Sequence, residues 1–128
     1  LKNGTIDVIT SDHNPFEVET KKIEFDNAEF GIIGLESAFG LINKNLEKHL
    51  TLNQIIEKIS NNPRKILGLK NNSIEEGNNA NITIFNPKTK WKFKEEDIIS
   101  KSKNSPFIGE ELKGKALAIY NNNRFKEL

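Results

Sequence analysis

A single strand-like segment precedes residue 80 in this chain of 128 residues. Residues 5–10 read Thr-Ile-Asp-Val-Ile-Thr, and this β-branched, apolar run is typical of a buried strand. A buried strand of the parallel type needs neighbouring strands and cover on both faces. The other segments of the first half have helical spacing, so they supply no such neighbour. We therefore expect the first half to be the last βα unit of a larger sheet or barrel.

Two or three helices are predicted after this strand. Apolar residues recur at helical spacing over residues 35–46, which favours a helix with one core-facing stripe. Thr51 and Gln54 have the spacing of a capping box at the start of a second helix. Asn62 before Pro63 is typical of an N-cap followed by proline at the first helical position, so a third helix is expected there.

After residue 70 the pattern changes from helical spacing to alternation. Residues 80–85 predict a strand that ends at Asn86-Pro87. Residues 90–94 alternate lysine with aromatic side chains, which predicts a second, half-exposed strand with its aromatic rings inward. Residues 115–125 predict a closing hairpin whose turn is the Asn-rich stretch 121–123.

An Asn-rich stretch at residues 71–79 separates the two patterns. We therefore expect an α/β chain of two units, residues 1–70 and residues 71–128. The chain has no Met and starts at Leu1, inside the region of the first strand. Together with the unpartnered strand, this leads us to expect that the chain is the end of a longer protein, a fragment of a larger fold.

The composition excludes several classes of function. Lys and Arg number 19 and Asp and Glu number 18, and this balance argues against a nucleic-acid partner. No apolar run approaches the roughly 18 residues of a membrane span, so no membrane partner is expected. The chain has no Cys, which excludes disulfides, cysteine metal ligands and thiol nucleophiles.

Asp12 is the main candidate for chemistry. It follows the first predicted strand, at the end where the active-site groups of a βα barrel project. A carboxylate there could bind a divalent metal or accept a proton, but a turn Asp is the plainer alternative. His13 adds one more potential ligand, and His49 lies in a polar connection where a solvent role is expected. Residues 17–27 are charged and unpatterned, which predicts a long exposed loop.

Five motifs, in order, resemble the dihydroorotases of the cyclic amidohydrolase family. The first resembles the family's last barrel strand with its Asp-His-x-Pro signature, and the others resemble its Gly-Ile-x-Gly-Leu-Glu segment, its Asn-Pro-Ala helix, its returning strand and its closing loop. In this chain they occupy residues 6–15, 31–37, 62–69, 74–87 and 102–115. The resemblance implies the last βα unit of a metal-dependent TIM barrel, followed by strands of a small β-sandwich domain.

The resemblance also implies an activity. Dihydroorotases interconvert N-carbamoyl-L-aspartate and dihydroorotate in pyrimidine biosynthesis, with zinc as the expected cofactor. Asp12 falls on the family's metal-ligand and general-base position, and the Phe30-Gly31 backbone falls where the family's loop hydrogen-bonds the substrate. His13 matches the histidine after that Asp, and we expect it to shape the site from behind the ligand.

The expected setting follows from the same resemblance. The substrate is a small molecule and the location is the cytoplasm. A homodimer and a complex with aspartate transcarbamoylase are the assemblies considered. The family's His-x-His pair, its metal-bridging lysine and its further histidine ligands have no counterpart in this sequence, so the isolated chain is predicted to be inactive.

Two positions depart from the family pattern. Phe16 stands where the family has a histidine that binds the substrate carboxylate, and Asn81 stands where it usually has Asp. Phe16 keeps open a non-catalytic homologue with an assembly role, whereas Asp12 disfavours it. A hydantoinase or allantoinase is the other alternative, because these enzymes share Asp-His-x-Pro.

Overall fold

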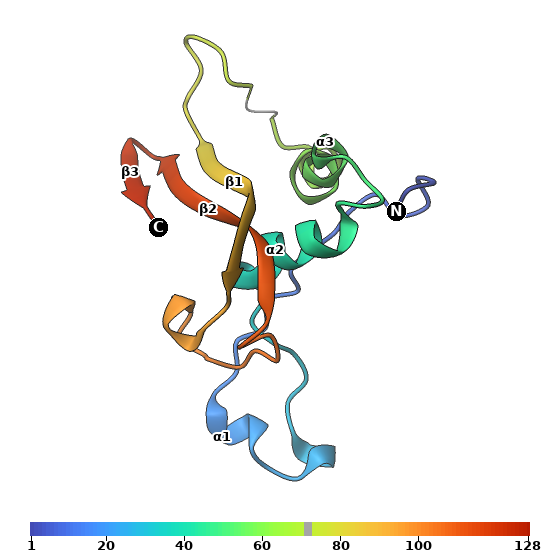
Figure 1. Cartoon of the computed structure of the whole chain (residues 1–128), viewed down its shortest axis with the longest axis vertical. Coiled ribbons are helices and arrows are strands. Elements are labelled where there is room, and N and C mark those ends of the chain that lie inside the picture. Colours follow the sequence, from blue (N-terminus) through green and yellow to red (C-terminus); the bar gives the residue numbers. More distant parts are fainter. Residues whose placement is uncertain (71–72) are drawn as a thin grey trace.

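The computed structural model describes residues 1–70 and 73–128. A helical first part precedes a three-stranded antiparallel sheet of order β1-β2-β3 (Figure 1). The helical elements are α1 (Val18–Lys21), the 3₁₀ turn η1 (Phe25–Asn27), α2 (Leu35–Leu46), α3 (Leu52–Ile56), the π turn η2 (Glu57–Asn61), α4 (Asn62–Ile66) and the 3₁₀ turn η3 (Glu95–Asp97). The strands are β1 (Ile82–Lys92), β2 (Glu111–Asn121) and β3 (Arg124–Glu127). None of the described helices has the length and apolar character that a membrane span requires.

Residues 5–10 are extended but belong to no strand, so the prediction of a buried strand is wrong for this structure. Ile6 is 54% exposed, while Val8 and Ile9 are half-buried. The reason is that no strand of the described residues lies along them. The nearest bridge among the described residues comes after this segment, between His13 and Ile32, and it is parallel.

The π turn η2 and the first residue of α4 supply hydrogen-bond partners for this extended segment instead. The Lys58 ammonium donates to the Ile6 carbonyl at 2.6 Å, and the Ile9 N–H donates to the Lys58 carbonyl at 3.0 Å. The Asn62 side-chain amide donates to the Asp7 carbonyl at 2.9 Å. One helical turn therefore fixes the backbone that leads to Asp12.

The helical elements α3, η2 and α4 follow one another without a break. The capping box at their start is confirmed: the Gln54 N–H donates to Thr51 Oγ1, and the Thr51 N–H donates to Gln54 Oε1. The predicted N-cap at Asn62 is wrong, because Asn62 has helical angles of φ −64 and ψ −46. The widened turn η2 comes just before Pro63, whose missing N–H cannot continue a regular ladder.

The sheet joins two predicted strands into one. β1 runs through Asn86-Pro87 and pairs with β2 over residues 82–86 and 90–92, with register irregularities on either side of Phe85-Asn86. Such a bulge accommodates a residue that cannot donate to the ladder, so the prediction of a strand end here is wrong. The inward aromatic rings are confirmed, since Phe93 is fully buried and Trp91 is half-buried.

The closing hairpin is confirmed as β2 and β3, which pair up to Asn121 and Arg124. Asn122 and Asn123 have positive φ angles of 50° and 58°, as a tight hairpin turn requires.

Helix α2 packs against β2 through small and polar residues. Gly40 and Gly114 allow close approach: a Cβ on Gly40 would lie 2.9 Å from Leu112 Cβ, and one on Gly114 would lie 2.7 Å from Phe39 Cε1. The buried residues of α2 are Ser37, Gly40 and Asn43. The predicted apolar stripe is only partly buried, since its first member, Leu35, is 63% exposed.

One hydrophobic core joins the two parts of the chain. Ile33, from the segment before α2, packs with Phe93, Ile98 and Leu112 from the second part. The loop that carries Phe107 covers this cluster from one side. This core places residues 31–34 firmly against the C-terminal sheet, next to the segment that carries Asp12.

Candidate active site around Asp12

Asp12 ends the extended segment in a turn that holds its carboxylate at the surface. Its φ angle is 44°, a left-handed conformation that Asp tolerates better than most residues. The Asn14 side-chain amide donates to Asp12 Oδ1 and to the Asp12 carbonyl, each at 3.2 Å. Asp12 is exposed, so its second carboxylate oxygen remains available to a ligand or a proton donor.

His13 caps helix α2 from outside the helix. Its Nδ1 accepts hydrogen bonds from the N–H groups of Gly34 at 3.1 Å and Leu35 at 3.4 Å. Both N–H groups lie at the start of α2, whose N-cap residue is Gly34, and backbone donors there have no partner within the helix. Because Nδ1 accepts, a neutral imidazole carries its proton on Nε2. His13 therefore ties the residue next to Asp12 to the start of α2.

Glu36, in the first turn of α2, links this helix to the loop after η3. Its Oε1 accepts from the Ser100 N–H at 2.8 Å and the Ser100 hydroxyl at 2.5 Å. Its Oε2 is buried and has no partner among the described residues. Burial alone would raise the pKa of Glu36, but the hydrogen bonds from the Ser100 hydroxyl and N–H hold this pKa below its ordinary value of 4.5.

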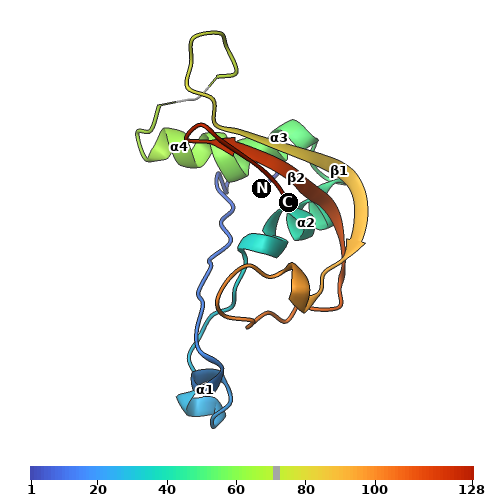
Figure 2. The ribbon, with the colours of Figure 1, turned by 90° about the vertical axis from the view of Figure 1, so that its left-hand side faces the viewer.

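Gly31 brings a second loop against the Asp12 turn. Its φ is 119°, and a Cβ there would lie 2.5 Å from Asn14 Cβ, so only glycine fits. The Asn14 N–H donates to the Ile32 carbonyl at 2.8 Å. In Figure 2 the chain leaving the body toward α1 and the chain returning from it run side by side. Phe30, just before Gly31, is 87% exposed.

The Gly31 carbonyl is held by two side chains from different parts of the chain. Asn104 donates to it through its side-chain amide at 2.8 Å, and the Lys21 ammonium donates to it at 3.1 Å. Lys21 also donates to the Glu29 carbonyl and lies 6.0 Å from the centre of the Phe16 ring. Phe16 itself is half-buried, so the position presents a hydrocarbon ring beside an ammonium group.

The predicted site residues are therefore brought together from two loops. Asp12 and His13 come from the first loop and Phe30 and Gly31 from the second. Sequence reasoning assigned no role to Glu36, Ser100, Asn104 or Lys58, although Glu36 and Asn104 lie inside the resembling motifs. The motifs were the only sequence feature that marked Glu36 and Asn104. The hydrogen bond from Asn104 to Gly31 spans 73 positions, and the periodicity of the sequence does not indicate it.

The described residues do not form a complete metal site. Residues 1–70 and 73–128 contain no cluster of three or more His, Asp or Glu side chains that could hold a metal ion. Asp12 offers one exposed carboxylate, and His13 has Nδ1 engaged with the chain. Asp12 therefore fits as one ligand of a metal ion, and the described residues supply no full set.

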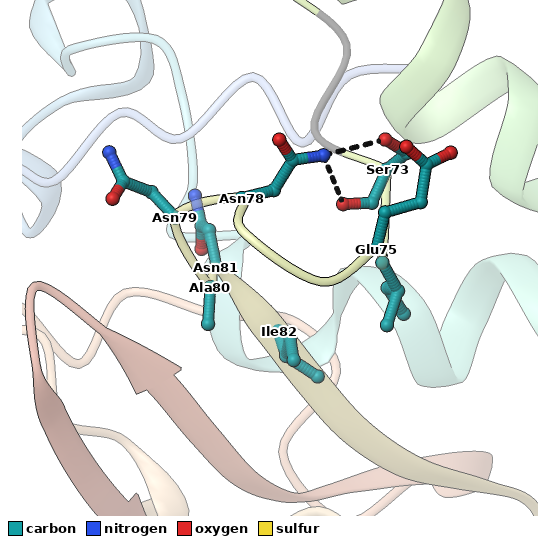
Figure 3. Close-up of a pocket in the computed structure, with 8 residues that line it drawn as sticks. Ser73, Glu75, Asn78, Asn79, Ala80, Asn81 and Ile82 are labelled. Carbon is teal, nitrogen blue, oxygen red and sulfur yellow. Dashed lines mark hydrogen bonds between the residues drawn. The ribbon is translucent and has the colours of Figure 1, made fainter.

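A small cavity of about 70 Å³ lies away from these residues, beside the Asn-rich turn before β1 (Figure 3). Asn78 closes that turn, because its side chain donates to the Ser73 hydroxyl at 3.0 Å. None of the predicted site residues lines this cavity.

The family model described as "Amidohydrolase family" matches residues 1–116, which is most of the chain. The chain belongs to the amidohydrolase family. A dihydroorotase from Chlorobaculum tepidum is 47% identical over 126 residues, which are 97% of this chain and 29% of that protein. The chain thus spans under a third of this relative's length. Members of the family are metal-dependent.

Solved structures agree on the fold. A D-hydantoinase (dihydropyrimidinase) from Thermus sp. superposes with a TM-score of 0.84 at 21% identity, over 97% of this chain and 29% of that one. An inactive dihydroorotase-like domain of a Chaetomium thermophilum CAD-like multifunctional protein superposes with a TM-score of 0.54 at 17% identity. This match covers 73% of this chain and 25% of that one. The expected fold class is therefore confirmed: helices and strands that form part of an amidohydrolase TIM-barrel protein.

Proposed function

We propose that this chain is the C-terminal portion of a dihydroorotase, the enzyme that interconverts N-carbamoyl-L-aspartate and dihydroorotate. The observation that carries the proposal is the exposed Asp12 carboxylate, held by Asn14 and set between the start of α2 and the Gly31 loop. The 47% identity to a dihydroorotase supports it. Residues 1–70 would complete a barrel and residues 71–128 would contribute to a small β-sandwich domain.

Asp12 serves as the general base in this proposal. It accepts a proton from the water that attacks the ring carbonyl carbon, and it returns that proton to the ring nitrogen as the C–N bond breaks. Ring closure reverses these steps and releases water. Asn14 supports the role because its amide donates to one carboxylate oxygen and leaves the other accessible.

Asp12 would also contribute one ligand to a zinc ion. Zinc, when bound, would polarise the ring carbonyl and make the attacking water acidic. The remaining ligands would come from residues other than the ones described. The backbone at Phe30-Gly31 would bind the substrate, and His13 would keep Asp12 in place through its bonds to α2.

The proposed setting is the cytoplasm, with a small-molecule substrate. A homodimer, or a complex with aspartate transcarbamoylase, would be the assembled state.

Assays of the complete natural protein with zinc and dihydroorotate test the proposal. We expect ring opening, measured as loss of dihydroorotate and gain of N-carbamoyl-aspartate, and we expect no turnover by the isolated chain of residues 1–128. The isolated chain lacks a full ligand set among its described residues. Turnover by the isolated chain would refute the second expectation, and no turnover by the complete protein would refute the proposal itself.

A non-catalytic homologue is the second candidate, and Phe16 favours it. A phenyl ring cannot donate a hydrogen bond to a substrate carboxylate. The inactive dihydroorotase-like domain from Chaetomium thermophilum shows that such domains occur on this fold. A hydantoinase would be recognised in the same assay by turnover of hydantoin in place of dihydroorotate.

A further inference from the structure

The loop after η3 reaches the candidate site although it belongs to the second part of the chain. Residues 98–109 leave the core at Ile98, directly after η3, pass Ser100 and Asn104, and return to the core at Phe107. Two of its residues bond to the site: Ser100 to Glu36 and Asn104 to the Gly31 carbonyl. The first contact fixes α2, and the second fixes the loop beside Asp12.

Asn104 makes a two-point contact with the Gly31 loop. Its side-chain amide donates to the Gly31 carbonyl at 2.8 Å, and its backbone carbonyl accepts from the Ile33 N–H at 2.9 Å. These two bonds bracket Ile32 and fix the orientation of the peptides on both sides of it. The loop that presents Phe30 and Gly31 is therefore held in register by one residue.

Asn104 is itself held in place before it meets the loop. Its N–H donates to the Ser102 hydroxyl at 3.2 Å. Phe107, three residues further on, packs against the core cluster of Ile33, Phe93, Ile98 and Leu112. The amide thus approaches Gly31 from a rigid support, which is what a positioning group needs.

The contact continues from Gly31 to Asp12. Gly31 lies so close to Asn14 that a Cβ would come within 2.5 Å of it, and Asn14 in turn donates to the Asp12 carboxylate. A shift of the Gly31 peptide would therefore move Asn14 and release the Asp12 oxygen that it holds.

We propose that Asn104 is a positioning residue for the site around Asp12, supplied by the second part of the chain. The expected effect on turnover rests on the proposed function. The expected effect on the Gly31 loop rests on the contacts alone. The second part of the chain then has a direct role in the site, through the Gly31 loop, besides covering the core.

The test uses the complete natural protein with Asn104→Ala and Asn104→Asp. Both variants keep the backbone bond to Ile33, and the second has nearly the same shape but places a carboxylate oxygen against the Gly31 carbonyl. Asn45→Ala is the matched control, because the Asn45 amide donates to a backbone carbonyl, that of Leu41, at 2.8 Å on an exposed turn of α2. Hydrogen exchange of the peptide that covers residues 30–34 and steady-state kinetics on dihydroorotate are measured for each.

We expect exchange at residues 30–34 to accelerate about tenfold in both Asn104 variants, and kcat/KM to fall about five- to tenfold in Asn104→Ala and further in Asn104→Asp, while Asn45→Ala changes neither. Unchanged exchange would overturn the inference. So would faster exchange with unchanged kcat/KM in an active protein, because the contact would then be structural only. If the wild-type protein does not turn over dihydroorotate, the proposed function fails and the exchange result alone decides whether Asn104 holds the loop.

Discussion

At the scale of single residues, His13 illustrates how the neighbour of a candidate base acts through the backbone. Its imidazole accepts hydrogen bonds from the two N–H groups at the start of α2, which have no partner within the helix. This leaves Asp12, one residue earlier, fixed relative to a twelve-residue helix. Glu36 and Ser100 secure the same helix turn from the other part of the chain.

Replacing His13 with alanine should destabilise the protein. Loss of an N-terminal cap costs about 1 kcal/mol, so the free energy of unfolding of the complete protein should fall by about that amount in His13→Ala. His49→Ala is the control, because His49 is exposed in the connection before α3. Urea unfolding measures both variants, and equal stability of the two would show that the cap contributes nothing.

At the scale of elements, the close contact of α2 with β2 depends on glycine. Gly114 and Gly109 have nearly the same backbone angle, with φ of 97° and 93°, but different surroundings. A Cβ on Gly114 would collide with Phe39, whereas one on Gly109 would meet nothing within 4 Å. The pair therefore separates the cost of strained backbone from the cost of lost packing.

Gly114→Ala should destabilise the protein more than Gly109→Ala does. Both substitutions strain the backbone, but only the first pushes α2 away from β2, which adds about 1–3 kcal/mol to the loss. Denaturant unfolding of the complete protein with each substitution gives the difference. Equal losses would mean that α2 can shift outward without cost.

The elements that the sequence predicts correctly are those with local chemistry. The Thr51 and Gln54 capping box and the Asn-rich hairpin turn are made within a few residues, so the pattern contains the whole interaction. The strand break predicted at Asn86-Pro87 fails because a bulge in a long antiparallel pair accommodates it. The N-cap predicted at Asn62 fails because its side chain bonds to Asp7, 55 positions away, inside a continuous helix.

The candidate site likewise contains some residues that sequence motifs indicate and others that only the structure reveals. Asp12, His13 and Gly31 were available from motifs, and the structure brings them to adjacent loops. The hydrogen bond from Asn104 to the Gly31 carbonyl could not be predicted from the motifs, because neither the spacing nor the residue type of Asn104 indicates a partner 73 positions earlier.

At the scale of the whole molecule, the two parts of the chain share one core and one candidate site. Ile33 packs among residues of the second part, and the loop at Asn104 holds the loop at Gly31. The chain covers 29% of the Chlorobaculum tepidum dihydroorotase, and Asp12 offers a single carboxylate to a metal. In the proposed enzyme, this segment therefore supplies the base and its support rather than a complete centre.

The most direct test of this account compares two aspartates of one segment in the complete natural protein. Asp12→Asn removes the proposed base, and Asp7→Asn removes an exposed carboxylate five residues earlier in the same extended run. We expect Asp12→Asn to lower kcat for dihydroorotate at least about a thousandfold with an unchanged unfolding midpoint, because asparagine cannot accept the proton. Asp7→Asn should retain near-normal turnover. Near-normal turnover by Asp12→Asn would contradict the central claim.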